Sequence, residues 1–384
     1  MASPSERVPI TPAVLAWAIA ESGYQPVDVA VKLGISEDVL RAWLAGAEQP
    51  RLTYLKKLAQ VLRRPKAIFL LPEPPDSTRP QVEFRYPPDS EREALNPDEL
   101  RYLREAARVQ RVAAWALAEL DEPLLSLPAM NVDVSPENAG REIRTLLGVT
   151  VEEQLAWESP SKALQAWRAM LQNLGVLVFQ LPLGRNACRG FSLWEERAPL
   201  ISINTAWNTE ARIFTLFHEL AHLLTRTDSA CIEATVYHRD ATDPAERWCE
   251  RFAAAVLMPW AAIANLLRRE CHWTPGKHLA DLNAVKLTAR RFKTSLRATL
   301  LRMIEHDAAS WEMFNELPTT ADAKRPGGGG QGRSRAQIML DRYGTRTTHV
   351  LVKAMDEDIL TRMDVLTYLD IPDDDLDDLR RGPG

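Results

Sequence analysis

The chain has 384 residues, 46% of them hydrophobic and 26% charged, which is the composition of a globular protein with more than one domain. The formal net charge of -5 excludes an overall basic field, so any contact with DNA must come from a local patch. No stretch reaches the ~20 apolar residues of a membrane span, and the first residues lack a basic region followed by an apolar run. The four cysteines have no CxxC spacing, which argues against a disulfide scaffold. We therefore expect a cytoplasmic protein without membrane contact.

Residues 8–70 are dense in helical periodicity and are interpreted as a first domain. The pattern predicts helices over residues 11–23, 27–33, 36–45 and 52–62. Thr11-Pro12 opens the first helix, and Gly23 ends it. Residues 71–90 are too rich in proline for regular helix, so residues 71–134 are interpreted as a linker followed by a connecting helix over 97–121.

Residues 135–310 combine helical and strand patterns and are interpreted as the second domain. A helical pair spans about 136–174, and β-branched and aromatic runs predict strands over 175–183, 190–195 and 199–204. Their close spacing suggests a small antiparallel sheet. Helices are predicted next over 208–225, 244–257, 259–269 and 279–305, and the basic run 287–302 predicts a solvated basic face on the last of them.

Residues 311–384 form a C-terminal extension. It holds a glycine-rich linker at 324–333, a predicted strand at 348–355, a short helix opened by Thr361 and an acidic tail that we expect to be mobile. The predicted fold class is α+β and mostly helical.

The strongest chemical signal is His218-Glu219-Leu220-Ala221-His222 within FTLFHELAHLL. On a helix, positions i and i+4 share a face about 6 Å apart, so both imidazoles can meet one Zn²⁺. The Glu beside the first His can then accept the proton of a water activated by the metal. The apolar flanks are typical of a buried catalytic helix, so two unrelated core histidines are the weaker interpretation. The pattern predicts His218 and His222 as metal ligands and Glu219 as the catalytic base.

A catalytic zinc site needs a third protein ligand. The next helix, ATDPAERWCERFAAAVLMP, offers Glu246 and Glu250 one turn apart. Cys249 and His238 are further candidates. Ligand type favours a carboxylate, and Glu246 is preferred to Glu250 on that ground.

Together, ARIFTLFHELAHLL and ERWCERFAAAVLMP resemble the ImmA/IrrE family of zinc metallopeptidases. The resemblance implies a zincin-like core with Glu246 as the third ligand, and relatives that cleave helix-turn-helix repressors. Glu250 departs from the family pattern, which has Asn at that position. A His₂-carboxylate site also accepts Mn²⁺. In zinc peptidases an edge strand commonly lines the cleft, and we expect the strand around residues 199–204 to do so.

Residues 11–65 resemble the XRE helix-turn-helix, a lambda-repressor-like helical domain, in which the third helix would enter the major groove. Arg41, Arg51 and Lys56 are the candidate DNA-binding residues. Glu37 and Asp38, however, begin the expected recognition helix, where they oppose the phosphate field. The alternative is a module that docks a protein, such as another helix-turn-helix repressor. Because such domains often pair, a homodimer is also possible.

These observations predict a zinc-dependent endopeptidase that cleaves a helix-turn-helix transcriptional repressor in a regulatory, stress-response or mobile-element setting. The alternatives are a DNA-binding regulator or antitoxin whose metal site is sensory or structural, and an adaptor whose metal domain binds a partner without cutting it. A structural zinc site does not need a general base such as Glu219, so the presence of Glu219 favours the enzyme over the alternatives.

Overall fold

The computed structural model describes several stretches of the chain, and the structural statements below concern those residues. They are residues 7–75, 83–85, 96–124, 127–185, 187–226, 229–231, 244–317 and 334–381. The chain divides into two compact units: an N-terminal unit of residues 1–81 with 89–105, and a C-terminal unit of residues 82–88 with 106–384.

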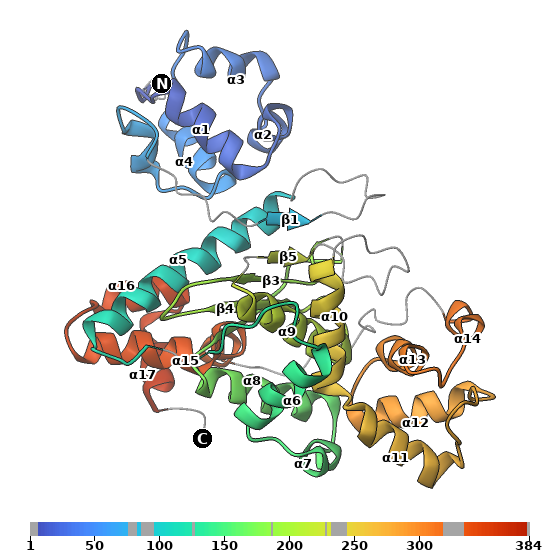
Figure 1. The fold of residues 1–384 in the computed structure, drawn as a ribbon. Coiled ribbons are helices and arrows are strands. Elements are labelled where there is room, and N and C mark those ends of the chain that lie inside the picture. The colour runs from blue at the N-terminus through green and yellow to red at the C-terminus, as the bar shows by residue number, and fades with distance from the viewer. Residues whose placement is uncertain are drawn as a thin grey trace. The chain divides into compact units, whose positions relative to one another are not determined.

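The N-terminal unit is a group of short helices around an apolar core (Figure 1). Its elements are α1 (Pro12–Ser22), α2 (Pro26–Leu33), α3 (Glu37–Leu44), α4 (Leu52–Val61) and the 3-10 helix η1 (Lys66–Leu70). The four predicted helices are all present. Pro12 takes the first helical position of α1, and Gly23 ends that helix at φ 76°, a left-handed conformation that costs glycine little. Leu40 and Trp43 bury the inner face of α3 in the core.

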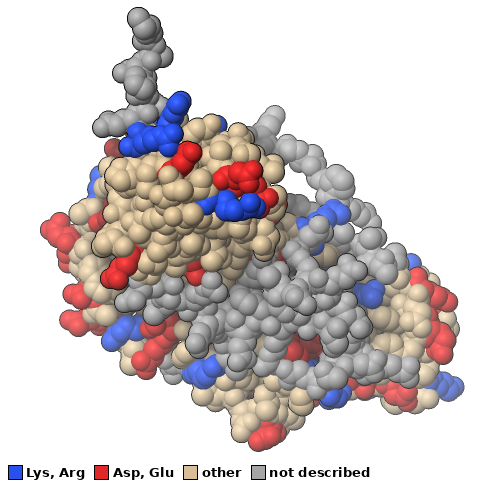
Figure 2. Space-filling view, turned by 90° about the horizontal axis from the view of Figure 1, so that it is seen from above, with Lys and Arg blue, Asp and Glu red and all other residues tan. Residues whose placement is uncertain are grey.

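Side chains of opposite charge lie next to one another on the surface of this unit. Figure 2 shows a mostly uncharged surface on which two clear blue patches lie beside red side chains. Two ion pairs of this kind join Arg7 to Glu48 and Arg41 to Glu37.

Helix α5 (Pro97–Glu119) contributes to both units. Its residues up to Glu105 belong to the N-terminal unit, and those from Ala106 belong to the C-terminal unit. In the latter, the Gln110 side chain donates hydrogen bonds of 2.9 Å to the carbonyl oxygens of Leu193 and Ala198.

The C-terminal unit contains a five-stranded mixed sheet in the order β1-β5-β3-β4-β2. The strands are β1 (Glu83–Arg85), β2 (Leu177–Leu181), β3 (Gly190–Leu193), β4 (Leu200–Asn204) and β5 (Ser229–Cys231). The three predicted strands are present, and β3 pairs antiparallel with β4 as expected.

The expectation of a purely antiparallel sheet is wrong, because β2 pairs parallel with β4, with Leu177 opposite Leu200. Strands β2 and β3 follow each other in the sequence but are not neighbours in the sheet, because β4 lies between them. Both β3 and β4 are buried along their whole length, which is typical of strands covered on both faces.

Helices pack around this sheet and bury the central helix α9 (Thr209–Leu224). Helix α9 lies against β3 and β4, and α8 (Pro160–Asn173) packs on α9 and β2. Helix α10 (Pro244–Leu257) packs on α9 and on α6 (Pro136–Leu146). The rings of Trp167 and Phe217 meet edge to face at 4.9 Å in this core. As a result, α9 buries residues on all of its sides, as the apolar flanks of the motif predicted.

The other helices of the C-terminal unit extend this arrangement, and among them α15 (Arg335–Asp356) packs directly on β2 and α8. They are α7 (Val151–Ala156), α11 (Trp260–Cys271), α12 (Leu282–Phe292), α13 (Leu296–Glu305), α14 (Trp311–Asn315), α15 (Arg335–Asp356), α16 (Arg362–Leu369) and α17 (Asp373–Arg381). The helix predicted over 279–305 is therefore two helices. Lys293 ends α12 in the left-handed region at φ 55°, and the Ser295 side chain caps α13. The solvated basic face is also wrong in part, because Arg302 is fully buried.

Two predictions for the C-terminal extension are wrong. Residues 348–355 lie inside α15 rather than in a strand, and the acidic tail forms α17. In α15, Thr347, Val350, Leu351 and Ala354 are buried at helical spacing, so tertiary packing overrides the strand preference of the β-branched residues. In α17, Asp residues occupy the first turn, where they complement the helix dipole.

Among the described helices, none alone is long and apolar enough to cross a membrane. Only α10 and α11 taken together, across a bend of 51°, meet those criteria.

Candidate metal centre

Three of the predicted site residues lie together in the structure. His218 and His222 come from successive turns of α9, and Glu246 comes from the first turn of α10. Both imidazoles are buried, with 2% and 3% of their surface exposed. The donor atoms of the three side chains all lie within 4.8 Å of one another. This triad can hold a metal ion.

The distances within the triad test whether zinc fits. The two Nε2 atoms are 3.3 Å apart, and the carboxylate oxygens of Glu246 lie 3.3 Å from Nε2 of His218 and 3.4 Å from Nε2 of His222. Zinc–ligand bonds of about 2.0–2.1 Å in a tetrahedron place neighbouring ligand atoms about 3.3–3.4 Å apart. The separations of the triad therefore match those between neighbouring zinc ligands, with a different Glu246 oxygen facing each histidine.

The other candidate ligands stand apart from this cluster. Glu250 is not part of the triad, although burial raises the pKa of its carboxyl to about 7 and the charge of Glu246 adds to that rise. The Cys249 sulfur is 3.9 Å from Nδ1 of His222, the ring nitrogen that faces away from Glu246. His238 lies outside the described residues. The structure thus groups Glu246, and not Glu250 or Cys249, with the two histidines.

Glu219 is fully buried beside the triad, and strand β3 approaches it closely at Gly190. A Cβ atom on Gly190 would lie 2.5 Å from Cγ2 of Thr215, 2.7 Å from the carbonyl oxygen of Ser202 and 3.2 Å from Cγ of Glu219. Only a glycine lets the strand pass this close to the helix. Sequence analysis missed Gly190, since a single glycine at the start of a strand gives no signal of what it faces.

We expect Gly190→Ala to lower both stability and activity. The added methyl group would force β3 and the Glu219 side chain apart, at a cost of about 1–3 kcal/mol in the free energy of unfolding. Zinc content should stay near that of the wild type, because none of the triad is contacted. Ser192→Ala, a buried change on the same strand, is the control. Full activity of the Gly190→Ala protein would show that the close approach does not position Glu219.

The electrostatic environment of the triad affects His218 most. Burial by itself lowers the pKa of His218, but the hydrogen bond and charge of Glu246, with the charges of Glu219 and Glu250, raise it to about 9. Below that pH the imidazole holds a proton that a metal must displace.

Metal affinity should consequently rise with pH. Between about pH 7 and 9 we expect an increase of roughly tenfold per pH unit, because binding releases one proton from His218 over this range. Above about pH 9 the imidazole is already neutral, and the increase should level off. Competition with a chelator of known proton affinity measures this slope. A flat profile would mean that His218 is neutral before the metal binds.

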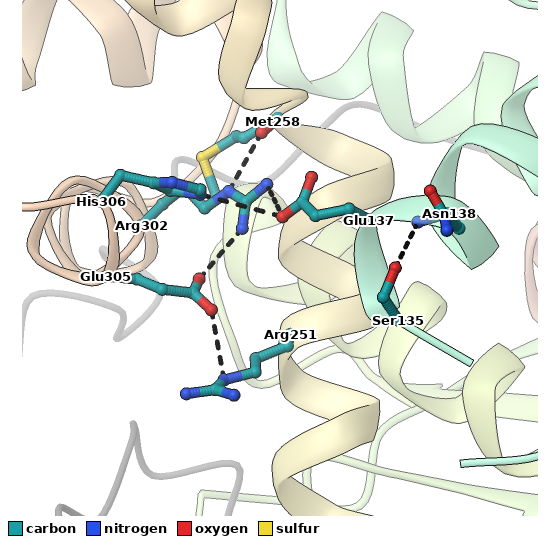
Figure 3. A network of polar contacts seen from close by, with 8 residues as sticks. All are labelled: Ser135, Glu137, Asn138, Arg251, Met258, Arg302, Glu305 and His306. Atoms are coloured by element: carbon teal, nitrogen blue, oxygen red, sulfur yellow. Dashed lines mark hydrogen bonds and ion pairs between the residues drawn. The ribbon is translucent and has the colours of Figure 1, made fainter. Parts of the chain in front are cut away.

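A network of ion pairs fixes the helix that carries Glu246. Figure 3 shows Arg302 of α13 between Glu137 of α6 and Glu305, with Arg251 of α10 on the other oxygen of Glu305. Arg302 lies 2.5 Å from Glu137 and 3.0 Å from Glu305, and its Nε donates to the Met258 carbonyl oxygen at 3.2 Å. Three helices that are distant in sequence thus meet at one buried guanidinium.

Replacing Arg302 with Met should destabilise the protein by about 3 kcal/mol. The change removes the cation shared by Glu137 and Glu305, and losing one partner of a buried pair costs about 3–5 kcal/mol. The low end applies because Glu137 is 42% exposed. Arg251→Met removes only the half-exposed end of the network and should cost less than about 1 kcal/mol. Urea unfolding of the two variants compares them, and equal losses would contradict a central role for Arg302.

The candidate DNA-binding residues lie on the N-terminal unit, on two of its elements. Arg41 is on α3, Arg51 directly precedes α4, and Lys56 is on α4; all three are exposed. The Arg41 guanidinium is 2.7 Å from Glu37 and 3.1 Å from Asp38 of its own helix. The one cation of the expected recognition helix is therefore already neutralised by carboxylates.

The expected edge strand is another correction. Strand β4, which covers residues 200–204, is paired on both sides and offers no free edge. Strand β3 is the one that passes Glu219, and β5 pairs with its other side, with Gly190 opposite Cys231.

One family model matches the part of the chain that contains this site. Residues 171–303 match the family described as Peptidase_M78, the IrrE N-terminal-like domain. No curated protein matches the chain. The matched segment includes His218, Glu219, His222 and Glu246. It therefore supports the ImmA/IrrE family, and with it a zinc metallopeptidase-like function, for this segment.

Proposed function

We propose that the protein is a zinc-dependent endopeptidase. The observation that carries this proposal is the triad of His218, His222 and Glu246 at the spacing of zinc ligands, with the buried carboxylate of Glu219 on the turn between the two histidines. The match of residues 171–303 to a peptidase family supports the same chemistry.

Each side chain of the site would have a separate role in peptide hydrolysis. His218, His222 and Glu246 would hold the ion, which when bound polarises the peptide carbonyl and lowers the pKa of water. Glu219 would accept a proton from the attacking water and pass it to the leaving amine. Because Glu219 is fully buried, little bulk water competes for that proton. Gly190 would keep Glu219 in position.

We further propose that the substrate is a helix-turn-helix repressor. The supporting arguments are the resemblance to a family that cleaves such repressors and the resemblance of residues 11–65 to the same kind of domain. The ion pairs of Arg41 with Glu37 and Asp38 favour protein docking by α3 over the reading of DNA, since phosphates would have to displace both carboxylates.

Co-expression tests the activity and the substrate class together. The wild type and Glu219→Gln are each produced with helix-turn-helix regulators encoded nearby, and the mass of every regulator is followed. A regulator cut only by the wild type supports the proposal and gives the scissile bond. Cleavage of an unrelated peptide library but of no regulator would keep the enzyme and reject the substrate class. No cleavage of either by zinc-loaded protein would contradict a constitutive peptidase.

A further inference from the structure

The N-terminal unit contains a cavity of about 520 Å³ that is separate from the expected recognition helix. No residue of α3 lines it. The lining residues come from the ends of α1, α2 and α4 and from the start of α5: Ser22, Tyr24, Lys32, Gln60, Val61, Arg63, Pro97, Asp98, Arg101 and Arg104. They all belong to the N-terminal unit.

Several contacts fix the wall that α5 contributes. The Asn96 and Glu99 side chains each accept a hydrogen bond from the other residue's backbone, at 2.9 and 2.8 Å, and so define where α5 begins. Leu100 packs against Gly23, where a Cβ atom would collide with it. The Arg104 side chain donates to the Glu21 carbonyl oxygen at the end of α1. These contacts hold the start of α5 against the end of α1, so the wall of the cavity that α5 forms has a defined position.

Positive charge gathers around this cavity. Four of its lining residues are cations (Lys32, Arg63, Arg101 and Arg104), whereas Asp98 is the one carboxylate among them. Asp98 is 69% exposed and lies 3.6 Å from Arg101. The nearby Glu21 carboxylate is 3.9 Å from Arg64, which does not line the cavity. The lining thus carries three more cations than carboxylates.

We propose that this cavity binds a phosphate-bearing small molecule of nucleotide size. Arginine and lysine are the residues that recognise phosphate oxygens in proteins. A volume of about 520 Å³ is far larger than a bare phosphate ion and lies in the range of small-molecule sites. The Gln60 amide and the Tyr24 ring supply polar and aromatic contacts for the rest of the ligand. The Lys32 ammonium stands 4.9 Å from the Tyr24 ring centre, so phosphate and ring contacts are adjacent.

Isothermal titration of the full-length protein with ADP and with pyrophosphate tests this site. We expect ADP to bind, and Lys32→Gln/Arg101→Gln to weaken its binding at least tenfold, because the pair supplies half of the cations in the lining. Lys57→Gln/Lys66→Gln removes the same charge from exposed positions of the unit outside the lining and should bind like the wild type. Arg63→Gln, a single exposed change, is the second test should the double variant fold poorly.

The remaining outcomes separate the possible sources of a signal. Pyrophosphate binding as tight as ADP binding would retain the phosphate site and remove the role of Gln60 and Tyr24. Binding that survives Lys32→Gln/Arg101→Gln but disappears when zinc is removed would place the anion at the metal centre and overturn the proposal. Equal losses in both double variants, or no binding of either probe at millimolar concentration, would also overturn it. Duplex DNA that binds through Lys32 and Arg101 while ADP does not would replace the proposal with a nucleic-acid surface.

Discussion

Purified Glu219→Gln should cleave its substrate about 10²–10⁴-fold more slowly than the wild type and should bind the same amount of zinc. The amide keeps the size of the side chain but cannot accept the proton of the attacking water, and general-base catalysis is worth about that factor. The triad is untouched, so the metal remains. Because Glu219 is fully buried, replacing its charge with a neutral group should not lower stability.

The measurement is kcat at saturating substrate, together with zinc content by elemental analysis. Glu210→Gln, in the first turn of the same helix, is the matched control and should retain wild-type rates. Undiminished cleavage by the Glu219→Gln protein would mean that another group accepts the proton. Loss of zinc from this protein would mean instead that Glu219 supports the metal rather than the water.

The second large effect should separate two carboxylates that lie one turn apart on α10. Glu246→Gln should lose zinc, because an amide oxygen replaces a charged ligand within the triad. The drop in affinity should exceed the roughly 10–100-fold that follows loss of a group that only orients a ligand. Glu250→Gln makes the same carboxyl-to-amide change on the same helix and should retain the metal, since Glu250 is outside the triad.

Zinc content after dialysis and a chelator competition at fixed pH compare the two variants directly. Both variants replace a carboxyl group of α10 with an amide, and measuring them above about pH 8, where Glu250 is also ionised, makes a difference between them report ligation. Should Glu250→Gln lose zinc while Glu246→Gln retains it, the assignment of the third ligand is reversed. Should both lose zinc equally, the two carboxylates act on the metal as a pair.

Local spacing made the first part of the site predictable. His218, Glu219 and His222 are fixed relative to one another by a single helix, so their chemistry follows from five consecutive residues. Glu246 is different, because a loop separates it from α9 and several residues of α10 had the right chemistry. The family resemblance favoured Glu246, and the packing of α10 on α9 places it, rather than Glu250, with the two histidines.

Other features depend on contacts that no local pattern contains. Gly190 faces Glu219 only because β3 crosses α9, and Arg302 meets Glu137 across most of the C-terminal unit's sequence. Strand β2 pairs parallel with β4 because β4, and not β3, is its neighbour in the sheet. The short connections between these strands predicted that successive strands would be neighbours. Residues 348–355 were misassigned because their β-branched side chains suit a strand, whereas burial on a helix stabilises them here.

The placement of the triad on two helices has a mechanical consequence. His222 lies in the last turn of α9 and Glu246 in the first turn of α10, and a long segment of chain connects the two helices. An ion bound by both would close that connection as a cross-link does, and so remove conformational freedom from the unfolded chain. Since the Met258 carbonyl oxygen at the end of α10 accepts a hydrogen bond from the buried Arg302 of α13, the cross-link would tie the folding of α13 to metal supply. Newly made chains would then reach their full rigidity only after they acquire the ion.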